Sequence, residues 1–171
     1  MKAAEVIALL GLEPLPVEGG LFRQTWRGPH DPVTKKPSGT AIVAMLTDEP
    51  DSFSAMHRLP TDEVWHFQLG DPIQLLLLYA DGSIDRPVLG PDLPTAQRLT
   101  HVVAAGTWMG ARLVPGGEFG VFGCTMAPGF VASDYEGAEA EDLCARYPDA
   151  ADEVRALFRP HETRRRLPDG Y

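Results

Sequence analysis

Short segments rich in apolar residues follow one another along most of the chain. A first strand is expected at Leu21–Arg27, where apolar and polar positions alternate. More candidate strands follow at a spacing of roughly ten residues: Thr40–Thr47, Ser52–Arg58, Glu63–Leu69, Ile73–Tyr79, Ser83–Val88, Arg98–Val103, Thr107–Leu113 and Glu118–Met126. Turn signals rich in glycine, proline and aspartate separate them. No crossover helix lies between these segments, so the pattern predicts an antiparallel sandwich or barrel and disfavours a parallel α/β sheet.

Helical patterns are expected at both ends of this strand-rich region. Residues 3–10 form a short helical segment with an apolar side. Glu139–Arg146 has the composition of a helix, and Pro148 breaks it. A second C-terminal helix is expected to begin at a cap formed by Asp149 and to run to about Phe158.

The chain is expected to form a single domain over residues 1–171. The barrel core is predicted at about 17–136 and a helical extension at about 137–160. Residues 161–171 form a tail without apolar periodicity, which is predicted to lie on the surface or to fray.

The charge balance argues against nucleic acid as a partner. Lysine and arginine number 15 against 24 aspartates and glutamates, a formal net charge of −9. An acidic surface repels phosphate backbones, and the short basic run Arg164–Arg166 is interpreted as solvated tail. The apolar N-terminal run is too short to span a membrane, and Cys124 and Cys144 form no CxxC pair. We therefore expect a cytoplasmic protein with reduced thiols.

The polar side chains best suited to chemistry gather in one short stretch. His57, Glu63 and His66 lie within ten residues, around a predicted tight hairpin. Imidazole and carboxylate groups together can bind a divalent metal or share a proton transfer. This stretch predicts where the site lies and leaves its chemistry open.

Four segments in this order resemble the cupin superfamily, and within it the small branch called DUF985 or cupin type 5. They are residues 17–26 (VEGGLFRQTW), 57–72 (HRLPTDEVWHFQLGDP), 103–108 (VAAGTW) and 123–136, which contain GCTMAPGF and DYE. The resemblance implies an all-β double-stranded β-helix, a jelly-roll-like barrel, to which the short N-terminal helix and one or two C-terminal helices are added. It also implies a homodimer or larger assembly. It says little about activity, because this fold hosts many functions.

The metal-ligand pattern of the cupin motifs is incomplete in this chain. Glu63 and Gly70 keep the spacing of the first motif, but His57 stands there without a second histidine of the usual pair. The histidine position of the second motif holds Met109, whose thioether is a poor ligand for hard or borderline metals. His57, Glu63 and the additional candidate His66 remain as predicted ligands of a divalent metal ion, the one cofactor considered.

The alternation of side chains along a strand places these candidates on different faces. In a regular strand Glu63 and Trp65 share one face, and His66 and Gln68 share the other. A bulge would be needed to turn both Glu63 and His66 into the barrel. In the alternative without a metal, His57 and Glu63 hydrogen-bond each other or a ligand in the barrel mouth, since an inward carboxylate needs a partner.

Further ligand-binding candidates come from the neighbouring motifs. Arg23, His66 and Gln68 are the polar candidates. Trp65 and Trp108 could line an amphipathic pocket, although core filling is the competing interpretation for each indole ring.

Two classes of function fit these residues. The leading hypothesis is a cupin that binds a small molecule, such as a sugar-like or keto compound, around His57 and Glu63. The alternative is an enzyme with these two residues in catalytic roles, either an isomerase or epimerase with His57 as base, or a metal-dependent lyase or dioxygenase. Cys124 is counted as a pocket residue and interpreted as an inert buried thiol rather than a nucleophile. A purely structural protein would not need two polar residues inside the barrel.

Overall fold

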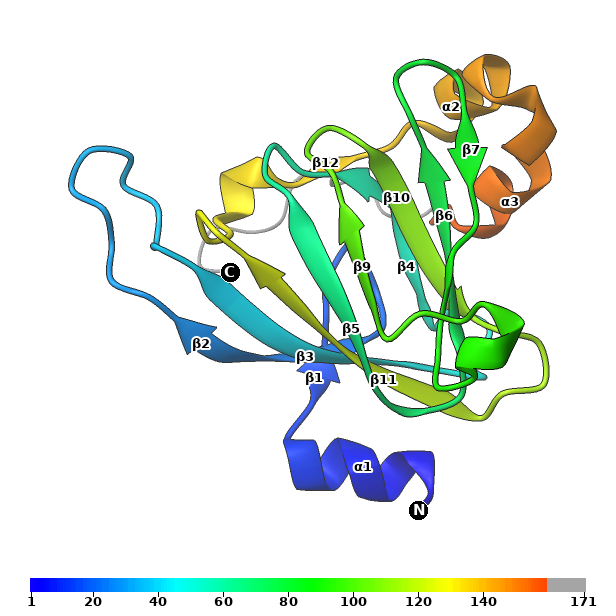
Figure 1. Ribbon diagram of the computed structural model, residues 1–171, viewed down its shortest axis with the longest axis horizontal. Helices are drawn as coiled ribbons and strands as arrows, with labels where there is room; N and C mark the ends of the chain where they lie inside the picture. Colours follow the sequence, from blue (N-terminus) through cyan, green and yellow to red (C-terminus); the bar gives the residue numbers. More distant parts are fainter. Residues whose placement is uncertain (160–171) are drawn as a thin grey trace.

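Two antiparallel sheets face each other and enclose the main core (Figure 1). The computed structural model describes residues 1–159. The predicted tail at 161–171, the basic run Arg164–Arg166 and the final residue of the predicted helical extension lie outside the described residues. The architecture is the predicted all-β barrel with an N-terminal helix and C-terminal helices.

The first sheet has six strands in the order β1-β2-β3-β11-β5-β9. Its members are β1 (Glu13–Pro14), β2 (Leu21–Arg27), β3 (Thr40–Thr47), β5 (Glu63–Gly70), β9 (Thr100–Val103) and β11 (Phe119–Met126). The second sheet has the order β12-β4-β10-β6-β7, with β8 also paired to β6. Its members are β4 (Phe53–Arg58), β6 (Ile73–Leu78), β7 (Ile84–Asp85), β8 (Val88–Leu89), β10 (Trp108–Leu113) and β12 (Glu136–Gly137).

The second sheet is buried on both faces, and β6 shows why its sequence is apolar throughout. Ile73, Leu75 and Leu77 point into the core between the two sheets. Leu76 and Leu78 point the other way, into a second core. A strand covered on both sides carries a continuous apolar run instead of an alternating one.

Helices cover the outer faces of both sheets. Helix α1 (Ala3–Leu10) packs Val6 against Val43 and Val121 of the first sheet. Helices α2 (Ala140–Arg146) and α3 (Ala151–Ala156) pack on the outer face of the second sheet. The C-terminal helices therefore cover a sheet face. Short 3-10 helices lie at Leu93–Thr95, Ala132–Asp134 and Pro148–Ala150.

Two local predictions are wrong. The expected strand Ser83–Val88 is divided into β7 and β8, because Pro87 between them has no N–H to donate to a ladder. Asp149 does not cap the last helix. It lies inside a 3-10 turn, and α3 begins only after Ala150. None of the helices within residues 1–159 is long and apolar enough to cross a membrane.

Candidate functional site

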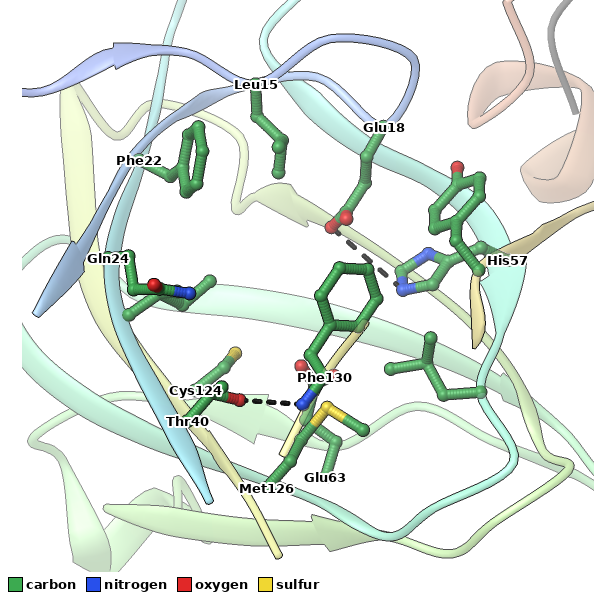
Figure 2. Close-up of a pocket in the computed structure, with 13 residues that line it drawn as sticks. Leu15, Glu18, Phe22, Gln24, Thr40, His57, Glu63, Cys124, Met126 and Phe130 are labelled. Atoms are coloured by element: carbon green, nitrogen blue, oxygen red, sulfur yellow. Dashed lines mark hydrogen bonds and ion pairs between the residues drawn. The ribbon is translucent and has the colours of Figure 1, made fainter. Parts of the chain in front are cut away.

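A small pocket opens between the two sheets beside the loop that precedes β2 (Figure 2). The space open to the centre of a water molecule is about 70 Å³. Its wall combines apolar and aromatic side chains with a few polar ones: Leu15, Glu18, Phe22, Gln24, Thr40, Ile42, His57, Leu59, Glu63, Cys124, Met126, Phe130 and Tyr135. A mostly apolar wall with a few convergent polar groups is typical of small-molecule sites.

Glu18 enters the pocket from a strained loop. Val17 has φ of 69°, a conformation in which a β-branched residue is a clear outlier. The loop is held by tertiary contacts, since Val17 is buried against Tyr135 and the Ala55 N–H donates to the Glu18 carbonyl at 2.8 Å. The Ser54 hydroxyl donates to Glu18 Oε1 at 2.8 Å. These contacts tie the Glu18 carboxylate to β4.

His57 lies on β4 with one ring nitrogen fixed and the other turned to the pocket. Its Nδ1 is 2.8 Å from the carbonyl oxygen of Ala55. A carbonyl can only accept, so Nδ1 carries the proton, and Nε2 of the neutral ring is an acceptor. That Nε2 lies 4.0 Å from Glu18 Oε1 (Figure 2). Tyr135 stacks on the imidazole with 5.1 Å between ring centroids and supports its orientation.

Glu63 begins β5 and is only 7% exposed. Its Oε2 accepts a hydrogen bond of 2.8 Å from Trp65 Nε1, and the Cys124 thiol also hydrogen-bonds the carboxyl. Burial raises the pKa of Glu63 from its ordinary value of 4.5 to about 7, in spite of the opposing influence of His57 and of the two hydrogen bonds. The negative charge of Glu18 adds to the increase. Near neutral pH, Glu63 is therefore present in both protonated and ionised forms.

Cys124 lies on β11 and is 5% exposed. Burial raises the pKa of its thiol well above the usual value, and the carboxylate of Glu63 adds to this effect. The thiol stays protonated at neutral pH and is a weak nucleophile. Its position suits a hydrogen-bond donor in the pocket wall.

Comparison with known proteins places this fold and its motifs in a family. Residues 4–138 match the Cupin superfamily (DUF985). The chain belongs to this family.

Two solved structures are similar to this cupin over nearly their whole length. A protein from Shewanella oneidensis is 30% identical, with a TM-score of 0.85, and the match covers 94% of this chain and 99% of that one. A hypothetical protein from Leishmania major is 26% identical, with a TM-score of 0.82, and the match covers 92% and 98% of the two chains. A point mutant of Bacillus subtilis oxalate decarboxylase is 11% identical at a TM-score of 0.55, with 92% and 40% covered, so it shares the fold alone. The curated proteins include no match.

Of the residues that the sequence proposed for the site, this cupin brings His57, Glu63 and Cys124 together in the pocket. Trp65 lies behind Glu63 in the main core, stacked on Phe122 at 4.6 Å between ring centroids. Its role there is to fill the core and to donate to the Glu63 carboxyl. Its contact with the pocket is therefore indirect.

The remaining candidates are not brought to this pocket, and strand parity is the main reason. His66 points to the opposite face of β5, where its Nε2 lies 3.0 Å from Thr125 Oγ1. Gln68 follows on that same face and is exposed. Arg23 alternates with the pocket residues of β2 and is also exposed. Trp108 lies under the Arg58 guanidinium, 4.6 Å away, in a separate surface groove.

The sequence interpretation missed other pocket residues that come from loops. Glu18, Phe130 and Tyr135 belong to the segments that carry the family resemblance, but their neighbours in space are far away in the chain. The pair of glycines after Glu18 was the available signal, since it indicates an unusual backbone at that point.

The donor atoms of this pocket do not fit a resident divalent metal. Within residues 1–159 no three His, Cys, Asp or Glu side chains are grouped so that they could hold an ion. Glu18 is held by Ser54 at one side of the pocket, while Glu63 is held by Trp65. Met109 pairs with His57 in register and is buried in the core, where it brings a thioether instead of an imidazole.

Proposed function

We propose that this cupin binds a small organic molecule in the pocket formed around Glu18, His57 and Glu63. The observation that carries the proposal is the burial of Glu63, a carboxyl group with a pKa of about 7 in the wall of a mostly apolar cavity. Burying an ionisable group is costly, and a core without a ligand could use an apolar residue there. A few convergent polar groups in an apolar wall are what a specific ligand requires.

The size of the cavity favours a compact ligand. The space of about 70 Å³ open to water centres is small, so it holds a small cluster of waters or the compact end of an organic molecule. A small sugar-like or keto compound with a few non-hydrogen atoms inside the wall is compatible with this volume. A nucleotide sugar would leave most of its atoms outside.

The test is ligand binding followed by thermal shift and calorimetry. A panel of small sugars, keto compounds, acids and amines is screened against the wild type, because a ligand that binds only the folded state raises the melting temperature. The expected result is a saturable shift that His57→Ala and Glu63→Gln reduce. Glu13→Gln, an exposed position on β1, is the matched control and keeps the shift. Binding that survives both pocket substitutions in folded protein would refute the proposal.

A second candidate function is proton transfer on a bound keto compound, as in an isomerase or epimerase. It is favoured by His57, whose Nδ1 is engaged by Ala55 so that Nε2 can accept a proton on the pocket side. A keto ligand incubated with the protein in deuterium oxide is expected to gain deuterium next to its carbonyl, and His57→Ala is expected to stop this. Binding without exchange would leave a binding protein only.

A further inference from the structure

The charges around the pocket are unbalanced in a way that points to the ligand. Two carboxyl groups, Glu18 and Glu63, face the cavity, and no lysine or arginine is among the thirteen described residues that line it. His57 can carry at most one positive charge, and in its neutral form it offers an acceptor at Nε2. The pocket therefore presents acceptors and negative charge to whatever enters.

Two cationic side chains near the pocket residues are held by other groups. Arg58 follows His57 in the chain, but it forms two hydrogen bonds of 2.7 Å with Glu136 and stacks on Trp108. Lys36 is bound to Asp134 at 2.7 Å. A third cation, Arg159, lies beside Gly19 and is held over the Phe53 ring, where it donates to the Asp51 carbonyl. These contacts engage the three positive charges, and none of them lines the cavity, so a ligand can supply the counter-charge for its carboxylates.

Aromatic rings complete the wall. Phe22 and Phe130 line the cavity (Figure 2). Tyr135 lines it as well and stacks on His57. Aromatic faces attract cations through the ring quadrupole, and a combination of aromatic and carboxylate groups is suited to ammonium ligands. Leu15 and Ile42 offer apolar surface to an alkyl group.

We infer that the pocket selects a small organic cation, an alkylammonium with few non-hydrogen atoms, over uncharged and anionic molecules of the same size. The inference rests on the proposed function, because it names the ligand class of the same pocket. The ammonium group would face the two carboxyl groups and donate to one of them, with its alkyl part against the apolar wall. An anion would meet two carboxyl groups and, among the described lining residues, no lysine or arginine.

Three probes of similar size, with four or five non-hydrogen atoms, test the inference by calorimetry and thermal shift: propylammonium chloride, 1-propanol and sodium propionate. Propylammonium is expected to bind saturably, at least about tenfold more tightly than 1-propanol, and propionate is expected not to bind. Glu18→Gln and Glu63→Gln are each expected to weaken propylammonium binding about 10- to 100-fold, the range for one charge-assisted hydrogen bond. Phe130→Leu is expected to weaken it less, through loss of the ring face.

The control variant is again Glu13→Gln, which removes one exposed carboxylate on β1 that is not part of the cavity wall. It is expected to keep full affinity. An equal loss in this variant would mean attraction to the acidic surface as a whole and would overturn the inference. Melting curves of each variant without ligand show whether it is folded.

The outcomes separate this inference from the proposed function. If 1-propanol or propionate binds as tightly as propylammonium, or if only sugars or keto compounds bind, the cation inference fails and the proposed function stands. If no small molecule of any class binds to the folded protein, both fail.

Discussion

Burial changes what the carboxyl group of Glu63 can do. In water a glutamate is ionised at neutral pH, but here removal from solvent favours the protonated form. The hydrogen bonds from Trp65 and Cys124 offset this only in part. A group that shares its proton near neutral pH can donate to a ligand, accept from one, or exchange a proton with it.

The first prediction is a pH dependence of stability that Glu63→Gln removes. Folding raises the pKa of Glu63, so the protonated carboxyl stabilises the folded state. This stabilisation is fully present below about pH 4.5 and is lost as the pH rises through about 7. Between these values the wild type is expected to lose on the order of 3 kcal/mol of unfolding free energy relative to Glu63→Gln. The uncharged amide of this variant resembles the protonated carboxyl and can still accept from Trp65.

Urea unfolding followed by tryptophan fluorescence at several pH values measures this difference. The control Glu13→Gln is expected to follow the wild-type curve. Parallel curves for the wild type and Glu63→Gln across this pH window would show that burial does not perturb Glu63.

The loop between β1 and β2 decides where Glu18 lies. Its backbone is tightly constrained, with positive φ at Val17 and at both glycines after Glu18. Hydrogen bonds from Gly19 N–H to the Leu15 carbonyl and from Leu15 N–H to the Gly20 carbonyl, both 3.0 Å, close it on itself. A strained segment that delivers a charged side chain to a cavity is a frequent property of binding sites.

The second prediction, at the scale of this element, concerns Gly19→Ala. Gly19 has φ of 100°, and an added Cβ would lie 2.6 Å from the carbonyl oxygen of Phe53. The loop must shift, so a loss of about 1–3 kcal/mol of stability and weaker ligand binding are expected. Gly82→Ala is the matched control, because Gly82 has φ of 91° and open space around the same position.

Melting curves and calorimetry of the two variants check this expectation. Both substitutions carry the backbone cost of positive φ, and only Gly19→Ala meets the steric obstacle. The same loss in both variants, with ligand binding intact, would show that the loop geometry is not needed for the site.

Over the whole molecule, the two outer layers explain why the pocket can be polar. Helix α1 covers one sheet, and α2 and α3 cover the other. The cores between the sheets and under each helical layer supply most of the apolar burial among the described residues. The barrel can then hold a few polar side chains at one end of its interior without relying on them for stability.

Much of the fold was predictable because strand signals are local. The predicted bounds of β2 and β3 agree with the structure, and most other strands begin or end within a residue or two of the predicted positions. Alternation along a strand depends only on its own residues, so the opposite directions of Glu63 and His66 were also predictable. The division at Pro87 was missed, although the missing N–H of proline is a sequence signal.

The candidate site was likewise predictable only in part. By itself the sequence determined the family, the strand pattern, the location of His57 and Glu63, and the side of the strand on which each candidate would lie. Only the tertiary structure decided that Glu18, Phe130 and Tyr135 meet them. Strands β2 and β3 lie between Glu18 and His57 in the chain, and β5 to β11 lie between His57 and Tyr135. Whether these residues meet therefore depends on which strands pair and how the two sheets pack. The physical reason is that alternation acts between neighbours in the chain, while a pocket is assembled by packing between segments that are far apart in it.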